Sequence, residues 1–445
     1  MTSLFNNATA VSNQDVRQLD REYVFHSWSA QGGLNPLVIA GAEGCELWDY
    51  DGKRYLDFSS QLVNVNIGYQ HPKVLAAMRA QLDALVTIAP ATANLARGEA
   101  AKRIVELAPA GFDKVFFTNA GADANENAIR MARLYTGRDK VLSAYRSYHG
   151  NTGSAIAATG DARRVPNEYS RGHVHFFNPY LYRSEFSAVT EEEECSRALA
   201  HLRRVIECEG PAAIAAILLE SVPGTAGILV PPAGYMQGVR ALADEFGIVL
   251  ILDEVMAGFG RTGSWFAFEQ DGVVPDLVTF AKGVNSGYVP AGGVLISEPI
   301  SRYFDDHFFA GGLTYSGHPL AMAAIVGTLD AMKEEGVVEN AAAVGRTTLR
   351  PGLDALAAKH AIIGEVRGRG LFQALELVSS RQTKKPIAAA GMAAIKSALT
   401  EAGLLSFVVE NRIHVVPPCV IRAEQVTQGL GILDTVLGAF GHLVE

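Results

Sequence analysis

The chain has 445 residues, of which 49% are hydrophobic and 19% are charged, and its formal net charge is −9. This length is enough for one large domain and a smaller one, each with its own core. A negative chain without a Lys/Arg cluster is a poor ligand for the phosphate backbone of nucleic acids. No apolar run approaches the roughly 20 residues that span a bilayer. We therefore expect neither a nucleic-acid partner nor a membrane partner.

The four cysteines are scattered and lack the spacing of a disulfide framework or a zinc site. The opening stretch MTSLFNNATA lacks the basic and apolar regions of a signal peptide. We therefore expect a cytoplasmic protein with reduced thiols and no bound metal. The only charge run, Glu191–Glu194, is interpreted as a solvated surface loop.

The first predicted element lies in an N-terminal segment, residues 1–60, as the hairpin pattern ELWDYDGKRYLDF with Asp51-Gly52 as its turn. Residues 61–325 are expected to form a large domain. Short apolar runs without polar alternation predict strands buried on both faces, and helical patterns lie between them, as at 122–135 and 234–246. The runs are at 115–118, 140–145, 214–220, 248–254 and 277–282.

After about residue 326 a long helix is expected to lead into a smaller α+β domain, residues 326–445, which the N-terminal segment joins. Strand-like patches lie at 362–377 and 404–416. Alternating strands and helices in the large domain predict an open, mostly parallel α/β sheet. Because ligands bind beyond the carboxyl ends of such strands, residues that end the apolar runs are the candidates for chemistry.

Lys282 ends the apolar run LVTFA. Burial at a strand end would lower the pKa of its amine toward a nucleophilic free base, which Schiff-base chemistry requires. The alternative is a lysine whose ammonium reaches solvent. Asp253 ends the run IVLIL. Its carboxylate could face a protonated pyridine nitrogen, or it could be a structural partner of a helix or an arginine. The adjacent Glu254 is interpreted as structural.

Two further signals are weak when taken alone. Gly121 and Ala122 begin the helical stretch 121–135, where free N–H groups and the helix dipole could bind a phosphate or merely start a helix. Tyr148 follows the predicted strand KVLSAY and could stack on a planar ring or fill the core.

Together and in order, these residues resemble the class III aminotransferases, also called the ω-aminotransferase group. The segments ILLESVPGTAGILVPPAGY, LILDEVMAGFGRTG, FAKGV and GGLTYSGHP carry the resemblance, which runs from about residue 20 to 440. It implies the aspartate aminotransferase-like α/β fold (PLP fold type I) and a pyridoxal-5′-phosphate (PLP) transaminase of EC class 2.6.1. Lys282 would carry the cofactor as a Schiff base and later move a proton, and Asp253 would pair with the pyridine nitrogen.

The resemblance also assigns the residues around the cofactor. Val255 would pack on one face of the ring and Tyr148 near the other, while Gly121 and Ala122 would bind the phosphate. Thr314 would reach the phosphate in a neighbouring subunit, which implies a homodimer with an isologous interface and leaves higher assemblies open. The reaction would be ping-pong: a primary amine gives its nitrogen to the cofactor, and a 2-oxo acid then collects it.

The substrate residues depart from the pattern of ornithine and 4-aminobutyrate enzymes. Their carboxylate-binding arginine falls here on His414, within NRIHVVPPC. Arg412 would point to the same face of a strand and could substitute, or it could be a surface residue. Met256 replaces their frequent glutamine. Both differences argue against ornithine and acetylornithine as donors.

Three further residues are substrate candidates. Glu220 matches a glutamate that neutralises the arginine in some members, although it could simply anchor the loop GTAG. Trp28 and Leu62, in VFHSWSAQ and SSQLVNVNIG, are candidate pocket walls, and these stretches resemble the taurine and ω-amine branch most.

The leading hypothesis is therefore an aminotransferase that uses taurine, β-alanine or a related amine as donor and pyruvate or 2-oxoglutarate as acceptor. An aminomutase or a PLP decarboxylase on the same fold is the alternative. A non-catalytic binding protein is disfavoured, because a buried lysine and a buried aspartate at strand ends cost stability unless they are used.

Overall fold

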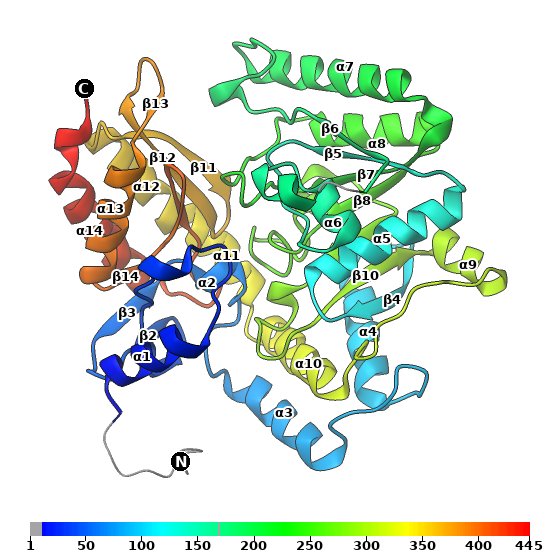
Figure 1. Ribbon diagram of the computed structural model, residues 1–445, viewed down its shortest axis with the longest axis horizontal. Helices are drawn as coiled ribbons and strands as arrows, with labels where there is room; N and C mark the ends of the chain where they lie inside the picture. The colour runs from blue at the N-terminus through cyan, green and yellow to red at the C-terminus, as the bar shows by residue number, and fades with distance from the viewer. Residues whose placement is uncertain (1–10, 168–169) are drawn as a thin grey trace.

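The computed structural model describes residues 11–167 and 170–445 (Figure 1). Seven strands form the central sheet of its larger part: β4 (Phe112–Thr118), β5 (Lys140–Ala144), β6 (His173–Phe176), β7 (Ile214–Glu220), β8 (Val249–Asp253), β9 (Leu277–Phe280) and β10 (Gly292–Ser297). Their order is β4-β10-β9-β8-β7-β5-β6, with β10 antiparallel to both neighbours and the remaining pairs parallel. The predicted α/β sheet is confirmed.

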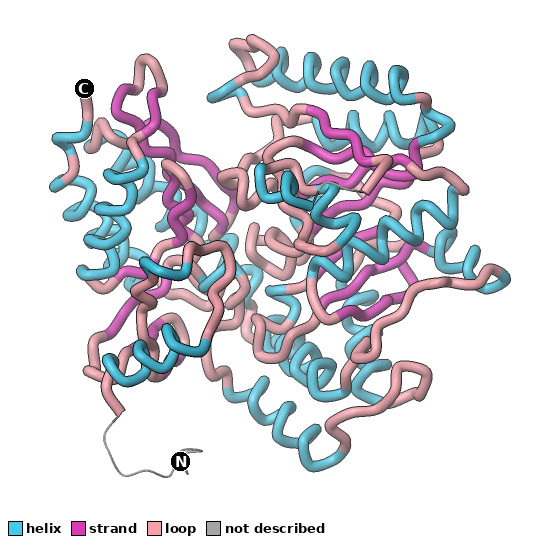
Figure 2. Tube along the Cα trace, viewed as in Figure 1, coloured by secondary structure: helices cyan, strands magenta, loops and turns pink. Residues whose placement is uncertain are grey.

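Both faces of this sheet are buried, which explains why its strands lack polar alternation. In β8, Val249 and Ile251 join one apolar cluster, whereas Leu250 and Leu252 join another. Helices cover each face, and Figure 2 shows the strands enclosed between them. One face carries α5 (Gly121–Thr136), α6 (Gly153–Ala158) and α9 (Glu298–Asp306), and the other carries α4 (Leu95–Leu107), α7 (Glu191–Glu209) and α8 (Tyr235–Phe246).

The smaller part of the molecule contains two further sheets. The first, of order β1-β2-β3-β14, is made of β1 (Gly41–Glu43), β2 (Glu46–Trp48), β3 (Arg54–Asp57) and β14 (Leu404–Leu405). The second is antiparallel and is made of β11 (Ile363–Arg369), β12 (Phe372–Ser380), β13 (Lys385–Pro386), β15 (Phe407–Val409) and β16 (Arg412–Val415). The predicted hairpin is confirmed as β2 and β3, joined through Gly52 at φ 84°.

The N-terminal segment and the C-terminal part meet in one sheet, because β3 pairs with β14 in parallel. Figure 1 shows the blue and orange-red ends of the chain on the same side of the molecule. This arrangement is in keeping with the predicted grouping of residues 1–60 with 326–445, while the exact boundaries stay a prediction. The remaining helices are α1 (Asn13–Tyr23), α2 (Ser60–Val63), α3 (Pro72–Ala84), α10 (Pro319–Glu334), α11 (Val337–Val344), α12 (Arg350–Lys359), α13 (Ala389–Glu401) and α14 (Ala423–Ala439).

Two local expectations differ from the structure. The long helix expected after residue 326 starts earlier, as α10, and Gly336 at φ 63° separates it from α11. The strand character predicted for 404–416 is confirmed, as the three short strands β14, β15 and β16. The run Glu191–Glu194 is not a loop: it is the first turn of α7, where carboxylates favour the helix dipole and Thr190 caps the helix. Glu194 is buried there and accepts a hydrogen bond from Tyr180 N at 2.7 Å.

Within the described ranges, no helix has the length and apolar character that crossing a membrane requires.

Candidate active site

The carboxyl ends of three adjacent parallel strands bring Glu220, Asp253 and Thr279 together. Glu220 lies opposite Asp253 in the register of β7 and β8, and Asp253 lies opposite Thr279 of β9. Lys282 follows two residues after β9 ends. This is the edge of an open α/β sheet where ligands bind.

Asp253 is held by three hydrogen bonds in the interior. His149 Nδ1 and Asn125 Nδ2 each lie 2.8 Å from its Oδ2, and the Val255 N–H donates to Oδ1 at 3.0 Å. Asn125 is fixed in turn by the Thr279 hydroxyl, which donates to Asn125 Oδ1 at 2.8 Å. The carboxylate therefore has one orientation, set by groups that are themselves buried.

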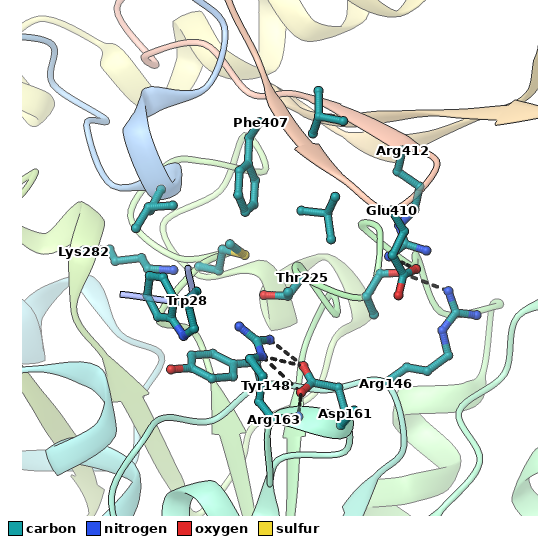
Figure 3. Close-up of a pocket in the computed structure, with 16 residues that line it drawn as sticks. Trp28, Arg146, Tyr148, Asp161, Arg163, Thr225, Lys282, Phe407, Glu410 and Arg412 are labelled. Carbon is teal, nitrogen blue, oxygen red and sulfur yellow. Dashed lines mark hydrogen bonds and ion pairs between the residues drawn. The ribbon is translucent and has the colours of Figure 1, made fainter. Parts of the chain in front are cut away.

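Lys282 is half-buried, and its side chain lines a cavity rather than reaching the outer surface (Figure 3). Burial lowers the pKa of its amine, and the negative charges of Asp253 and Glu220 act in the opposite direction. Its backbone has φ 42°, a left-handed conformation that costs a residue with a β-carbon roughly 1–2 kcal/mol. A lysine held in this way is suited to act as a nucleophile.

Two adjoining cavities meet at this lysine. The larger is about 760 Å³ and the smaller about 410 Å³. They share the side chains of five residues, namely Leu62, Tyr148, Thr225, Met256 and Lys282. Asp253 and Glu220 line the smaller cavity. The two volumes form one site with Lys282 at the junction.

Gly121 and Ala122, at the start of α5, also line the smaller cavity. No side chain caps this helix, so its first N–H groups face the cavity without a side-chain partner. A β-carbon on Gly121 would lie 2.9 Å from both γ-carbons of Val255. An uncapped, positively polarised helix end beside such close packing is suited to a phosphate group.

Tyr148 and Val255 lie on different elements that border the smaller cavity. Val255 follows β8 and packs against Gly121, and Tyr148 follows β5 and lines both cavities. The guanidinium of Arg163 lies 3.9 Å from the centre of the Tyr148 ring, which restrains the ring by a cation–π contact. Figure 3 shows Lys282 and Tyr148 on the same side of the larger cavity.

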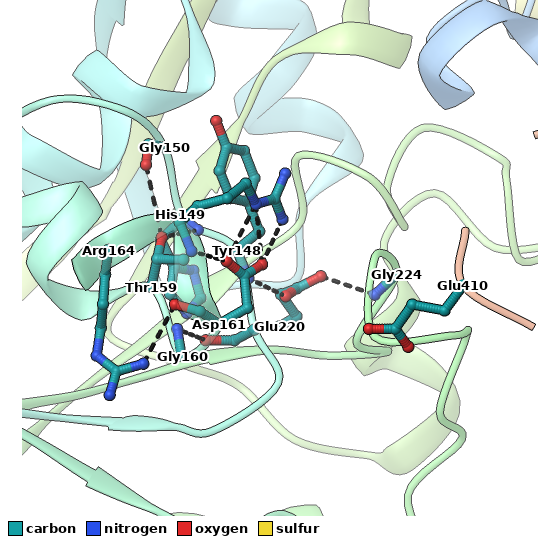
Figure 4. Close-up of polar contacts among 12 residues, drawn as sticks. Tyr148, His149, Gly150, Thr159, Gly160, Asp161, Arg164, Glu220, Gly224 and Glu410 are labelled. Carbon is teal, nitrogen blue, oxygen red and sulfur yellow. Dashed lines mark hydrogen bonds and ion pairs between the residues drawn. The ribbon is translucent and has the colours of Figure 1, made fainter. Parts of the chain in front are cut away.

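Glu220 is buried and is held by two backbone donors (Figure 4). The Tyr148 N–H donates to its Oε1 at 3.1 Å, and the Gly224 N–H donates to its Oε2 at 2.8 Å. Burial raises its pKa, while His149 lowers it. The side chain thus anchors the GTAG loop and lines the cavity at the same time.

Arg412 and His414 lie on the same strand, β16, but only Arg412 lines a cavity. Arg412 is buried and pairs with Glu410, whose Oε2 lies 2.6 Å from Arg412 Nη2. His414 is fully buried against the Phe407 ring, and burial, together with Arg412, lowers its pKa to about 3. Of the two, the geometry therefore favours Arg412 as a substrate-binding residue.

Two more arginines line the larger cavity and were not predicted. Arg146 has its guanidinium 5.3 Å from the centre of the Tyr180 ring and donates to the Ala226 carbonyl at 3.1 Å. Burial and the nearby Arg412 lower its pKa. Arg163 pairs with Asp161. Figure 3 shows Arg146 and Arg412 at the end of the cavity far from Lys282.

The remaining predicted site residues are exposed to different degrees. Trp28 and Leu62 line the larger cavity, and they are 63% and 44% exposed. The Met256 side chain borders both cavities. Thr314 is exposed and does not line either cavity of this chain.

Comparison with known proteins gives the family. Residues 28–437 match the model of the class III aminotransferases. The chain belongs to this family. It is 34% identical over 406 residues to the taurine–pyruvate aminotransferase of Bilophila wadsworthia, covering 87% of each chain, and 38% identical over 414 residues to the 5-aminovalerate aminotransferase of Pseudomonas aeruginosa, covering 90% of this chain and 93% of the relative.

Solved structures agree with this assignment. The taurine:2-oxoglutarate aminotransferase from Bifidobacterium kashiwanohense, solved with PLP and glutamate, has a TM-score of 0.95 and 43% identity over 98% of this chain and 99% of that one. An (S)-selective ω-transaminase from Thermomicrobium roseum has a TM-score of 0.92 at 36% identity, over 97% of this chain and 99% of that one. The chain is thus a transaminase of PLP fold type I.

Class III aminotransferases use PLP, and the site of this chain fits that cofactor. The uncapped start of α5 suits a phosphate, the buried Asp253 suits a protonated pyridine nitrogen, and the amine of Lys282 suits the carbonyl carbon. All three groups border the smaller cavity.

Reasoning from the sequence missed His149, Asn125, Arg146, Arg163 and Glu410. His149 stands next to Tyr148 and could have been proposed as a partner for a buried carboxylate. The two arginines carry no such signal, because an arginine in a loop is more often a surface residue. Arg146 and Arg412 lie far apart along the sequence, and only the fold brings them near each other.

Proposed function

We propose that this class III aminotransferase transfers the amino group of an ω-amine that carries an acid group, such as taurine or β-alanine, to pyruvate or 2-oxoglutarate. One observation carries the proposal: the larger cavity runs from Lys282 at one end to Arg412 and Arg146 at the other. A donor with its amine at one end and a sulfonate or carboxylate at the other matches this charge distribution. The taurine-specific names of several relatives support the same class of donor.

At the reacting end, each residue has a distinct task. When bound, PLP would draw electrons from the carbon that bears the amine and carry the nitrogen from donor to acceptor. Lys282, once its amine is free, would move the proton between that carbon and the cofactor. Asp253 would hold a proton on the pyridine nitrogen, with His149 and Asn125 keeping its carboxylate in place. Val255 and Tyr148 would hold the two faces of the ring.

The acid of the donor would bind at the far end. Arg412 is buried at the start of β16, and its guanidinium can donate two parallel hydrogen bonds to a carboxylate or a sulfonate. Leu62, Trp28 and Met256 would form the apolar walls around the carbon chain. Glu220 would anchor the loop beside the ring. The donor product leaves before the 2-oxo acid enters, so both substrates use the same cavity in a ping-pong sequence.

The active unit in this proposal is a homodimer. Thr314 is exposed, and its neighbour Tyr315 and the nearby Phe308 expose 64% and 88% of their surface. Exposed aromatic side chains beside a polar residue are typical of a subunit interface. Thr314 would reach the cofactor phosphate in the neighbouring subunit. The four free cysteines support a reducing compartment, and we place the enzyme in the cytoplasm.

A half-reaction tests the proposal. PLP-loaded protein is mixed with taurine, β-alanine, 4-aminobutyrate, ornithine or 1-phenylethylamine without any oxo acid, and the visible absorbance of the cofactor is followed. We expect loss of the visible band with taurine or β-alanine and its return on addition of pyruvate or 2-oxoglutarate. The Lys282→Ala protein is the matched control and should show neither change.

The alternative reactions give different results in the same experiment. A decarboxylase would release carbon dioxide and would not need an oxo acid to complete its cycle. An aminomutase would convert a single substrate without any external oxo acid. A protein that binds PLP through Lys282 yet reacts with none of the ω-amines would contradict the proposed donor class.

A further inference from the structure

The ion pair between Arg412 and Glu410 joins a buried cation to an exposed anion. The side chain of Arg412 is 5% exposed and that of Glu410 is 71% exposed. Both line the larger cavity. Glu410 lies in the two-residue turn between β15 and β16, and its backbone has φ 51°, a left-handed conformation that is uncommon for residues other than glycine. The turn therefore holds a carboxylate at the mouth of the site, where a substrate acid would have to bind.

The positive charge at this end exceeds the negative charge. Arg146 makes no ion pair with any residue in the ranges 11–167 and 170–445, and the pair with Glu410 is the only one that Arg412 makes there. Nε of Arg412 is buried and has no hydrogen-bond partner among the same residues. Only one of the two guanidinium groups thus has a carboxylate partner among the described residues, so this end of the cavity keeps an unsatisfied capacity for an anion.

Other carboxylates near the site are already committed. Glu220 receives the N–H groups of Tyr148 and Gly224, and Figure 4 shows Glu410 apart from that cluster. Glu376 is buried with Arg183 and Arg367, and these cations lower its pKa to about 2. Because Glu410 faces solvent, its side chain can rotate away from Arg412 without disturbing any packed neighbour.

We propose that Glu410 is the resident counter-ion of Arg412 and that the distal acid of a substrate displaces it. Glu410 then sets how strongly the site prefers substrates with a distal acid, such as 2-oxoglutarate, over substrates without one, such as pyruvate. With pyruvate bound, Glu410 neutralises Arg412. With a dicarboxylate bound, Glu410 turns to solvent and the substrate takes its place. This inference rests on the proposed binding of a substrate acid at Arg412.

A competitive ligand without an amine or an oxo group tests the inference directly. Glutarate is titrated into the PLP-loaded protein by calorimetry, for the wild type, Glu410→Gln and Glu410→Asp. The shorter aspartate keeps the charge but no longer reaches Arg412. We expect both variants to bind glutarate about three- to tenfold more tightly, because the competing carboxylate has gone from the arginine. Glu424→Gln, which changes an exposed glutamate at the start of α14, is the matched control and should bind as the wild type does.

Activity gives a second readout. In Glu410→Gln the ratio of kcat/KM for 2-oxoglutarate to that for pyruvate should rise by about threefold or more. Glutarate affinities within twofold of the wild type in both Glu410 variants would overturn the inference. So would a gain in Glu424→Gln equal to that in Glu410→Gln, since the effect would then be one of net charge. A wild-type protein that transaminates nothing would instead contradict the proposed function, and the glutarate titration would still report on Glu410.

Discussion

His149 Nδ1 lies 2.8 Å from Oδ2 of Asp253, and both side chains are almost completely buried. A carboxylate only accepts hydrogen bonds, so the imidazole donates through Nδ1. Asn125 donates to the same oxygen, and the Val255 N–H donates to the other. Asp253, the carboxylate that we expect opposite the cofactor ring, is therefore held in place by three donors.

Replacing the Asp253 carboxylate with a neutral side chain should lower kcat. In Asp253→Asn the shape is kept, but the side chain can no longer hold a proton on the pyridine nitrogen. We expect kcat to fall by about 10²-fold or more. Stopped-flow measurement of the half-reaction with the best donor checks this. A thermal unfolding midpoint close to the wild type would show that the loss is chemical, whereas an unchanged kcat would remove Asp253 from the mechanism.

Lys282 should be irreplaceable even by another cation. An arginine stays protonated and cannot form the covalent link to the cofactor. In Lys282→Arg we expect turnover to fall by about 10³-fold or more, since nucleophile and proton carrier are lost together. Borohydride reduction followed by peptide mass spectrometry should locate the cofactor on Lys282 in the wild type and nowhere in the variant. Cofactor found on a different lysine would contradict the assignment.

The start of α5 provides a steric prediction. In Gly121→Ala the new β-carbon would lie 2.9 Å from the γ-carbons of Val255, so one of them must move. We expect a loss of about 1–3 kcal/mol in the free energy of unfolding and PLP binding about tenfold weaker. Gly98→Ala on α4 is the control, because no atom lies within 4 Å of its β-carbon position. It should stabilise the helix by about 0.5–1 kcal/mol. PLP titration by fluorescence distinguishes the two variants.

Glu254 should make the stability of the protein depend on pH. Burial raises its pKa to about 7, from an ordinary value of 4.5, although Ser221 and the N–H groups of Ala267 and Phe268 donate to it. The folded state therefore binds more protons than the unfolded state between these two values. Its contribution to stability is fully present below about pH 4.5 and is lost as the pH rises through about 7.

The size of this effect is about 3 kcal/mol, because each pKa unit corresponds to 1.36 kcal/mol. Glu254→Gln cannot titrate, so the difference in unfolding free energy between the wild type and this variant should fall with pH across that window. Urea unfolding at a series of pH values from 4.5 to 8 checks it. A difference that stays constant would mean that Glu254 is ionised in the folded protein.

Arg412 should discriminate between donors. In Arg412→Gln we expect kcat/KM for taurine or β-alanine to fall by about 10- to 100-fold, the range of one charge-assisted hydrogen bond. 1-Phenylethylamine has no acid group, so its kcat/KM should change by less than about threefold. Because both donors are compared on the same protein, a folding defect would lower the two values together. An equal loss for both donors would therefore exclude a specific role in acid binding.

The central sheet could be predicted from the sequence because its strands are apolar along their whole length. The run 214–220 coincides with β7, and the others differ from their strands by a few residues, since strands covered on both faces must be apolar throughout. Lys282 and Asp253 stood out because a charged residue at the end of such a run is unusual. The cofactor and the family followed from their order along the chain.

What could not be predicted depends on contacts between distant segments. Arg146 and Arg412 share one end of a cavity only because the loop after β5 faces β16 in the folded protein. Glu194 looked solvated in a run of four glutamates, yet the turn after β6 buries it. The capping box at the start of α1 is different, because Ser12 and Asp15 form it within one turn and the local sequence alone could have predicted it.

The pairing of β3 with β14 has a consequence for how the chain is made. Leu56 and Leu404 are partners in that sheet, although they lie near opposite ends of the sequence. A ribosome adding about 5–20 residues per second needs roughly 20–70 s to make the stretch between them. Throughout this time β3 lacks β14 as its neighbour, and all seven strands of the central sheet are made within the same interval. The central sheet can thus assemble before β14 is made, and β14 then completes the smaller sheet beside β3.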